Sequence, residues 1–251
     1  MFNNLKILFH QGKQFIRNTS TVKVPGIFRG RPVINTEKVN ETELIDLCPV
    51  NAISSNPVSI DMGKCTFCGE CAKRFPNKIR FTDDYKISTN ERNRLIVKEG
   101  EDKLVEVDPE TVRSEIHRMF DNSLKLRQVS AGGDNSCEWE LNASNNVQFD
   151  MGRYGIEFVA SPRHADGIVI TGPITENMAE ALQICYDAVP EPKIIVLVGT
   201  DAISGGIHSG SSALNRSFLE KYPVDLYIPG NPAHPLTIIN GLVDLTRKRK
   251  K

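Results

Sequence analysis

The sequence predicts an α/β protein whose C-terminal half forms an open, doubly wound parallel sheet and whose N-terminal half contains a small α+β domain. Two observations lead to this fold class. Beyond Leu124, short apolar and β-branched runs alternate with stretches of helical periodicity, which is the pattern of parallel βαβ units. Before Leu124, four of the six cysteines fall between positions 48 and 71, a spacing that organises a small domain around a metal centre.

The clustered cysteines form one complete ligand set. Cys65, Cys68 and Cys71 are spaced C-x2-C-x2-C, and Cys48 precedes a proline. In two-cluster bacterial ferredoxins each cluster takes three thiolates from such a run and the fourth from a distant Cys-Pro. We therefore expect these four cysteines to hold one 4Fe-4S cluster in a ferredoxin-like α+β domain. A structural zinc site is the alternative, although zinc motifs usually run as two separated C-x2-C pairs.

A second ferredoxin cluster has no ligands in this half of the sequence. Counting back from the first Cys-Pro with the same spacing reaches Lys38, Glu41 and Leu44 instead of three thiols. The fourth thiol, which should precede a proline, is replaced by Phe75. Because one set is complete and the other is wholly absent, we expect a single cluster in this domain.

Length and composition are those of an ordinary soluble protein large enough for two domains. The chain has 251 residues, 39% hydrophobic and 25% charged, and no apolar run approaches the length needed to cross a bilayer. Its net charge of zero predicts no nucleic-acid partner. Cys137 and Cys185 lie far apart, so we expect no disulfide framework and a reducing, cytoplasmic compartment.

The first residues predict a basic amphipathic helix over positions 2–17. No acidic residue occurs before Glu37. The apolar stripe and the basic residues around it are Phe2, Leu5, Phe9 and Ile16, and Lys6, Lys13 and Arg17. Such a helix suits a membrane surface or a partner subunit, while a core-facing helix and a transit peptide are the alternatives. Positions 18–36 follow as an extended arm interrupted by proline and glycine.

The connection between the two halves is strongly charged. We expect a short hairpin between positions 95–97 and 104–107, turning around Gly100. A helix should then run from Asp108, as N-cap, to about Phe120, because Pro109 suits the first helical position.

The elements of the C-terminal half follow from its periodicity. The expected strands are 124–131, 155–160, 167–171, 193–199 and 224–229. The expected helices are 175–189, with Cys185 on its apolar stripe, and 236–247. The predicted divisions of the chain are an amphipathic helix and extended arm at 1–36, the cluster domain at 37–82, a linker with ribbon and helix at 83–123, and the sheet domain at 124–251.

Six stretches of the C-terminal half resemble a known family: 131–138, 153–156, 161–166, 171–175, 199–206 and 229–235. They are similar to the small subunit of energy-converting nickel-iron hydrogenases of the formate-hydrogenlyase type, and to the complex I subunit that carries the quinone-proximal cluster. The resemblance covers about positions 124–245 and implies a flavodoxin-like parallel sheet. The N-terminal half resembles the polyferredoxin subunit of the same complexes, so the chain is interpreted as a fusion of two neighbouring subunits.

The resemblance also implies a second 4Fe-4S site, held in that family by four cysteines beyond the strand ends. Matched one at a time, these positions are Asp134, Cys137, Asp201 and Asn231 here. Oxygen ligands are poor substitutes for thiolates in iron–sulfur clusters, so we expect this site to be degenerate and without a cluster. A divalent metal on the carboxylates and a pocket filled by hydrogen bonds are the alternatives.

No nucleophile elbow or dinucleotide fingerprint is present, so we expect a non-catalytic or electron-transfer subunit. The resemblance implies large-subunit-like and membrane subunits as partners, and a peripheral position on the cytoplasmic face of the inner membrane. The loops 161–166 and 229–235 are the expected docking face for the large-subunit-like partner. The alternative function is a non-redox scaffold whose cluster is structural.

Overall fold

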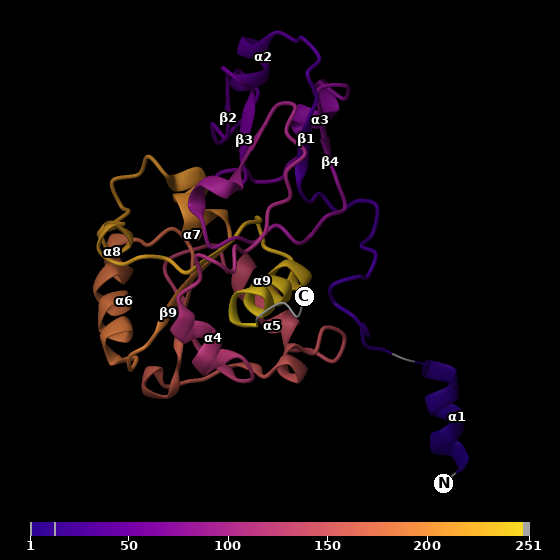
Figure 1. The fold of residues 1–251 in the computed structure, drawn as a ribbon, viewed down its shortest axis with the longest axis vertical. Helices are drawn as coiled ribbons and strands as arrows, with labels where there is room; N and C mark the ends of the chain where they lie inside the picture. The colour runs from indigo at the N-terminus through magenta and orange to yellow at the C-terminus, as the bar shows by residue number, and fades with distance from the viewer. Residues whose placement is uncertain (1, 13, 248–251) are drawn as a thin grey trace.

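A small unit formed by residues 32–98 lies against one end of a five-stranded sheet in the computed structural model (Figure 1). The structure describes residues 2–12 and 14–247. Lys13, predicted on the polar side of the first helix, and the basic residues 248–251 lie outside the described residues.

Five parallel strands form the central sheet, in the spatial order β10-β9-β8-β6-β7. The strands are β6 (Leu124–Ser130), β7 (Ile156–Phe158), β8 (Gly167–Thr171), β9 (Ile194–Val198) and β10 (Leu226–Ile228). Counted in chain order the arrangement is 2-1-3-4-5, the doubly wound order of flavodoxin-like folds. The predicted parallel sheet is confirmed, and each strand lies inside its predicted range.

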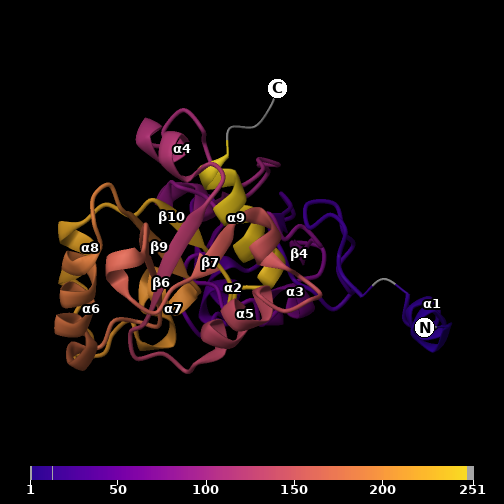
Figure 2. The ribbon, with the colours of Figure 1, turned by 90° about the horizontal axis from the view of Figure 1, so that it is seen from below.

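Helices cover both faces of the sheet (Figure 1, Figure 2). One face packs against α4 (Ser114–Phe120), α5 (Ser136–Ser144) and α9 (Pro235–Thr246), and the other against α6 (Glu176–Ala188), α7 (Thr200–Ser204) and α8 (Ser217–Lys221). Strand β9 shows why both faces need cover: Ile195 and Leu197 join one apolar core, whereas Val196 and Val198 join the other. Three short 3-10 turns lie in the connections: η2 (Met151–Tyr154), η3 (Pro162–His164) and η4 (Gly206–His208).

The two predicted helices of this half are confirmed as α6 and α9. Cys185 of α6 is half-buried and packs against the core, as its place on the apolar stripe predicts. Ile184, which directly precedes Cys185, lies on the exposed side of α6.

The N-terminal unit contains two small antiparallel sheets. In one, β1 (Pro32–Ile34) pairs with β4 (Ile79–Phe81); in the other, β3 (Ser59–Asp61) lies between β2 (Ile53–Ser54) and β5 (Ile96–Lys98). The unit is completed by α2 (Glu41–Asp46), α3 (Glu70–Arg74) and the 3-10 helix η1 (Arg92–Leu95). Leu44, Ile60, Met62 and Ile79 belong to the same apolar core as the α6-facing side of the sheet. The unit and the sheet therefore share a continuous apolar interior.

The predicted hairpin at 95–107 is wrong. Strand β5 pairs with β3 of the cysteine-containing unit, and residues 104–107 form no strand. Val105 and Val107 are buried against the two apolar cores instead. The alternation of apolar residues in this segment therefore reflects burial of a loop rather than strand pairing.

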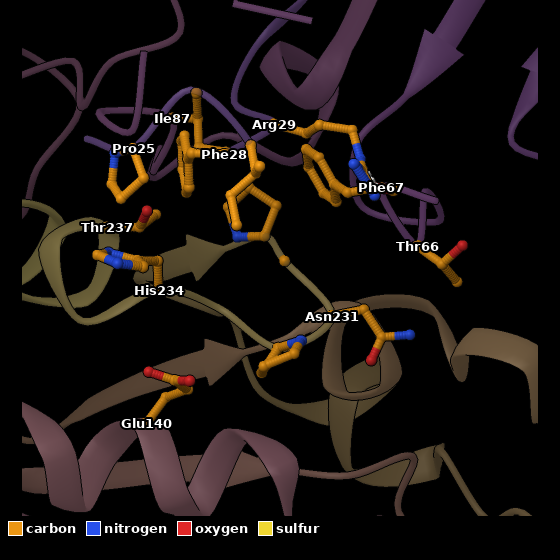
Figure 3. Close-up of a pocket in the computed structure, with 14 residues that line it drawn as sticks. Pro25, Phe28, Arg29, Thr66, Phe67, Ile87, Glu140, Asn231, His234 and Thr237 are labelled. Carbon is orange, nitrogen blue, oxygen red and sulfur yellow. Dashed lines mark hydrogen bonds between the residues drawn. The ribbon is translucent and has the colours of Figure 1, made fainter. Parts of the chain in front are cut away.

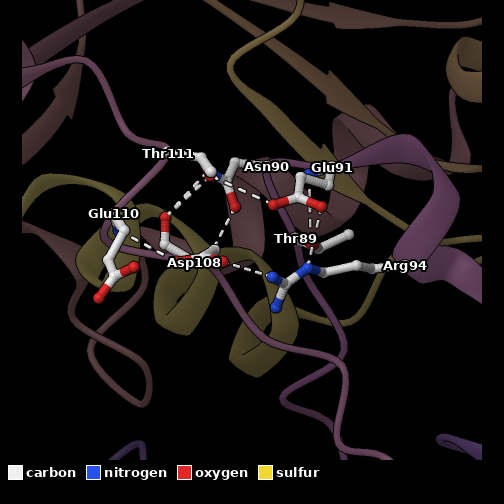
Figure 4. Close-up of polar contacts among 7 residues, drawn as sticks. All are labelled: Thr89, Asn90, Glu91, Arg94, Asp108, Glu110 and Thr111. Carbon is white, nitrogen blue, oxygen red and sulfur yellow. Dashed lines mark hydrogen bonds and ion pairs between the residues drawn. The ribbon is translucent and has the colours of Figure 1, made fainter.

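The helix before the sheet begins later than predicted, at Ser114 instead of just after Asp108, and residues 109–111 form a turn. The Asp108 side chain is engaged in other contacts: it accepts a hydrogen bond from a backbone N–H of that turn and forms an ion pair with Arg94 (Figure 4). Asn90 holds the backbone of Asp108 in both directions, donating to its carbonyl at 3.1 Å and accepting its N–H at 2.8 Å. These contacts fix Asp108 as a loop residue.

The N-terminal helix α1 (Phe2–Gln11) is also shorter than the predicted span of 2–17. It projects away from the rest of the described chain (Figure 1), and its side chains Leu5, Ile7, Leu8 and Phe9 are exposed, 83% for Phe9 and 64% for Leu8. The chain rejoins the sheet domain at Ile16, whose N–H donates to the carbonyl of Gln148 at 2.8 Å. The core-facing alternative for this helix is not what the structure shows.

Within the described residues, no helix is both long enough and apolar enough to cross a bilayer.

Candidate metal centre

The four cysteines of the predicted cluster site come from neighbouring segments of the N-terminal unit. Cys48 follows α2, Cys65 and Cys68 lie between β3 and α3, and Cys71 is in the first turn of α3. All four line a single pocket whose other walls are largely apolar, among them Leu47, Val50, Ile53, Ile60 and Phe81. The structure therefore brings the predicted ligands together around one space.

The cluster loop, residues 62–69, is curled by its backbone. Phe67 (φ 54°) and Gly69 (φ 82°) both adopt left-handed conformations, which only glycine enters without strain. At the start of the loop the Cys65 N–H donates to the carbonyl of Asp61 at 2.9 Å, so the loop is tied to the end of β3. Curling of this kind turns several thiols of a short segment toward one point.

Backbone N–H groups already point at two of the sulfurs. The Ala52 N–H donates to Cys48 Sγ at 3.2 Å, and the Phe67 N–H donates to Cys65 Sγ at 3.3 Å. Hydrogen bonds to cysteine sulfur stabilise negative charge on it and are one of the means by which a protein tunes an iron–sulfur cluster.

Two of the thiols, Cys65 and Cys71, are held in their protonated form by their surroundings. Burial, with the neighbouring thiols adding to it, raises the pKa of Cys65 to about 12 and that of Cys71 to about 11. A metal cluster would replace these protons and neutralise the thiolates. Four thiols, an apolar wall and inward N–H donors together fit a 4Fe-4S cluster.

Access to the pocket from solvent is on the Cys68 side. Cys68 is exposed, whereas Cys65 is buried and the other two are intermediate. A shallow groove beside Cys68 carries three basic side chains, Arg29, Lys73 and Arg80.

The residues of the second site, Asp134, Cys137, Asp201 and Asn231, lie in loops and helix starts at the carboxyl ends of β6, β9 and β10. Parallel strands bring these ends to one edge of the sheet, where ligands of such folds usually bind. The structure places Asp134, Cys137 and Asp201 within electrostatic reach of one another: burial raises the pKa of Asp201, and the Asp134 charge raises it further. Across the described residues, no three or more His, Cys, Asp or Glu side chains gather closely enough to hold a metal ion, and this applies to the four cysteines of the N-terminal unit as well as to this second site.

One oxygen of the Asp134 carboxylate, Oδ1, is hydrogen-bonded to Ser136, the first residue of α5. Its Oδ1 accepts the Ser136 N–H at 2.9 Å and the Ser136 hydroxyl at 2.6 Å. These two hydrogen bonds hold the pKa of Asp134 below its usual range. The Asp134 carboxylate thus accepts the N–H of the first residue of α5, which directly precedes Cys137.

Cys137 and Asp201 are packed against glycines. A Cβ built on Gly199 would lie only 2.4 Å from Cys137 Sγ, and one built on Gly206 would lie 1.8 Å from Asp201 Oδ1. Burial raises the pKa of Cys137 to about 12, with the neighbouring carboxylates contributing. Asp201 Oδ1 is buried with no hydrogen-bond partner among the described residues. One closely packed thiol among carboxylates does not fit a 4Fe-4S cluster.

Asn231 lines a cavity to which Asp134, Cys137 and Asp201 do not contribute within the described part of the chain (Figure 3). This cavity lies between the N-terminal arm, the cluster loop and residues 229–234, and its walls include Phe28, Thr66, Phe67 and His234. Gly230, directly before Asn231, keeps the loops of β9 and β10 together, because its carbonyl accepts the Thr200 N–H at 2.9 Å.

Sequence reasoning missed the contact that joins the two sites. The hydroxyl of Thr200, at the start of α7, donates to the carbonyl of Cys65 at 3.0 Å in a buried position. Nothing in the local pattern around Thr200 signals this role, because its acceptor lies 135 residues away in the chain.

The C-terminal half matches a known family. The family model of the NADH ubiquinone oxidoreductase, 20 Kd subunit, matches residues 135–245, which lie wholly in the sheet domain. A probable membrane-bound hydrogenase subunit mbhJ of Pyrococcus furiosus is 34% identical over 123 residues, which are 49% of this chain and 74% of that protein. A subunit of the NADH-quinone oxidoreductase of Geobacter metallireducens is 41% identical over 115 residues, 46% of this chain and 67% of that protein.

One similar solved structure is a chain of the membrane-bound sulfane sulfur reductase, an archaeal respiratory membrane complex. It has 28% sequence identity and a TM-score of 0.43, and the match covers 49% of this chain and 67% of that one. The resemblance of positions 124–245 is confirmed by the sequence matches to both kinds of relative. The chain therefore belongs to the family of the NADH ubiquinone oxidoreductase 20 Kd subunit.

Proposed function

We propose that this chain is an iron–sulfur electron-transfer subunit of a membrane-associated oxidoreductase complex, hydrogenase-like or complex-I-like, that carries one 4Fe-4S cluster. The observation that carries the proposal is the single pocket lined by Cys48, Cys65, Cys68 and Cys71. The relatives are named as subunits of a membrane-bound hydrogenase and of NADH-quinone oxidoreductase, which supports the class of complex.

The N-terminal unit is proposed to be a polyferredoxin-like domain, at 37–82, fused to the sheet domain at 124–251. Its cysteine loops and paired short strands support this interpretation. The connection at 83–123 is assigned to neither the polyferredoxin-like domain nor the sheet domain. Its strand β5 nevertheless pairs with β3 of the cysteine-containing unit.

A bound cluster would supply one-electron transfer, and the chain's residues would hold and shield it. The four thiolates anchor it, the apolar walls exclude water, and the N–H groups of Ala52 and Phe67 stabilise charge on two sulfurs. The exposed Cys68 side leaves the shortest route for an electron to or from a partner. The second site is proposed to hold no cluster, because only one of its four residues is a thiol, Asp134 is hydrogen-bonded to Ser136, and the Cys137 sulfur packs against Gly199.

A scaffold with a structural cluster is the second candidate. It is favoured because the second site lacks three of four thiols, so an electron on the N-terminal cluster has no second cluster within this chain to move to. Redox titration of the anaerobically purified protein, followed by EPR, separates the two. An electron-transfer role predicts an EPR signal that appears on reduction and disappears on reoxidation. A cluster that keeps one oxidation state throughout the titration would leave only the scaffold.

The partner face is proposed to be the carboxyl edge of the sheet, which carries residues 229–235 after β10. Loop 161–166, expected on the same face, instead precedes β8 and lies at the opposite, amino edge, where the Asp166 N–H donates to the carbonyl of Lys125 near the start of β6. Two large apolar side chains on neighbouring elements are exposed, Trp139 at 70% and Ile207 at 67%. Exposed aromatic and aliphatic anchors of this kind are typical of protein interfaces. A large-subunit-like protein is the proposed occupant of this carboxyl-edge face.

Removing α1 should release the protein from membranes without changing its iron content. The helix exposes Leu8 and Phe9 beside basic residues, which suits a membrane subunit or anionic lipid. Its deletion leaves the cysteine pocket intact, because the pocket contains no residue of α1. The measurement is the fraction that sediments with membranes at low salt, with Phe9→Glu as a point variant. Full-length protein that remains soluble and without partners at low salt would contradict the membrane-associated assignment.

A further inference from the structure

Helix α7 of the sheet domain lies directly behind the cluster loop. The Thr200 hydroxyl, in its first turn, is 3.0 Å from the Cys65 carbonyl and 3.1 Å from the Gly230 carbonyl, and it donates its one hydrogen between them. Thr200 is almost completely buried. The hydroxyl therefore joins the backbone of a cluster ligand directly to the loop that follows β10.

Arg216 fixes the position of α7. Its guanidinium donates to four carbonyls: those of Pro173, Asp201, Ala202 and Ile203, at 2.9, 3.3, 2.8 and 3.0 Å. Three of these carbonyls are in α7 itself, so the helix is held against the loop after β8. Thr200 is consequently presented from a rigid support.

The cluster loop is seated on the same helix by packing. A Cβ built on Gly63 would lie 2.8 Å from the Ile203 side chain and 2.8 Å from the Arg92 guanidinium, so only glycine fits between them. Arg92 in turn forms a bidentate pair with Asp61, at 2.8 and 2.6 Å. The carbonyl of Asp61 accepts the Cys65 N–H. Cys65 is thus held at its N–H from one side and at its carbonyl from the other.

We propose that Thr200 is a positioning residue that holds Cys65 in place and raises the reduction potential of the cluster. Through this residue the sheet domain would influence the reduction potential of the cluster in the N-terminal unit. This inference rests on the proposed function, since it requires the cluster. The hydroxyl lies within hydrogen-bonding distance of the Cys65 carbonyl, and the positive end of its O–H dipole beside this ligand would favour the extra negative charge of the reduced cluster. In the step concerned, the cluster gains one electron from a reduced partner and loses it to an oxidised one, and no bond or proton changes.

The test is the midpoint potential of the cluster, measured by EPR-monitored titration of the full chain. Thr200→Val keeps the shape but removes the donor, so the potential should shift to a more negative value. Thr200→Ser keeps the hydroxyl, so its midpoint potential should equal that of the wild-type protein. Ser204→Ala is the matched control: it removes another hydroxyl of α7, whose hydrogen bonds among the described residues are to the Thr200 carbonyl, at 3.1 Å, and from the Gly206 N–H, at 3.2 Å.

Each outcome separates this inference from the proposed function. If Thr200→Val loses iron while Thr200→Ser and Ser204→Ala retain it, the seating role is supported. A wild-type potential in Thr200→Val, or an equal shift in Ser204→Ala, would overturn the inference while leaving the cluster assignment intact. Wild-type protein without a reducible cluster would instead overturn the proposed function itself.

Discussion

Replacing Cys65 with serine should remove the cluster and loosen the N-terminal unit, with iron falling from about four to below about one per chain. Cys65 is the most deeply buried of the four ligands, and its backbone is held on both sides by Asp61 and Thr200. A serine hydroxyl is a far weaker ligand than a thiolate, and the pocket would lose the group that crosslinks its segments. Iron analysis, with hydrogen exchange of the N-terminal unit, measures both effects.

Cys137→Ser is the matched control for that experiment, because Cys137 is also a buried thiol. Its sulfur packs against Gly199 rather than facing the cluster pocket. Iron content should therefore remain unchanged in this variant. Loss of iron from Cys137→Ser would mean that the second site binds a cluster after all.

Replacing Gly199 with alanine should destabilise the sheet domain by about 3 kcal/mol. Gly199 adopts φ 92° and ψ 156°, a region that is essentially confined to glycine. The added methyl group would also lie 2.4 Å from Cys137 Sγ, far inside van der Waals contact. Urea unfolding of the two proteins measures the difference.

A double-mutant cycle separates backbone strain from the clash. Cys137→Ala removes the sulfur and leaves a Cβ at 3.7 Å from the new methyl group, which is an ordinary contact. The pair Gly199→Ala and Cys137→Ala should therefore show a favourable interaction free energy of about 1–2 kcal/mol. Strictly additive effects would mean that the sulfur does not fill this space.

The parallel sheet and the cysteine set could be predicted because both have a local signature. Strands buried on both faces, such as β8 and β9, appear as continuous apolar runs. The spacing of Cys65, Cys68 and Cys71 likewise directs thiols to one point through a short loop, whatever surrounds it.

The errors arose where long-range contacts override a local signal. Asp108 followed by proline is a sound helix start in isolation, yet Arg94 and Asn90 engage Asp108 as part of a loop. The apolar residues at 104–107 suggested a strand, but Val105 and Val107 are buried without pairing. Propensity could not show either outcome, because the competing partners lie on other elements.

The same limit applies to the junction of the two sites. The motif positions of Asp134 and Asp201 could be found by resemblance, but their contacts could not. That Thr200 donates to Cys65, and that Gly63 fits against Ile203, depends on how the N-terminal unit docks on α7.

Iron and acid-labile sulfide per chain, measured on protein purified anaerobically, test the central claim most directly. One cluster on Cys48, Cys65, Cys68 and Cys71, with none at the second site, predicts about four of each. About eight of each would show a second cluster and contradict the degenerate second site. Neither iron nor sulfide above background would contradict the cluster assignment itself.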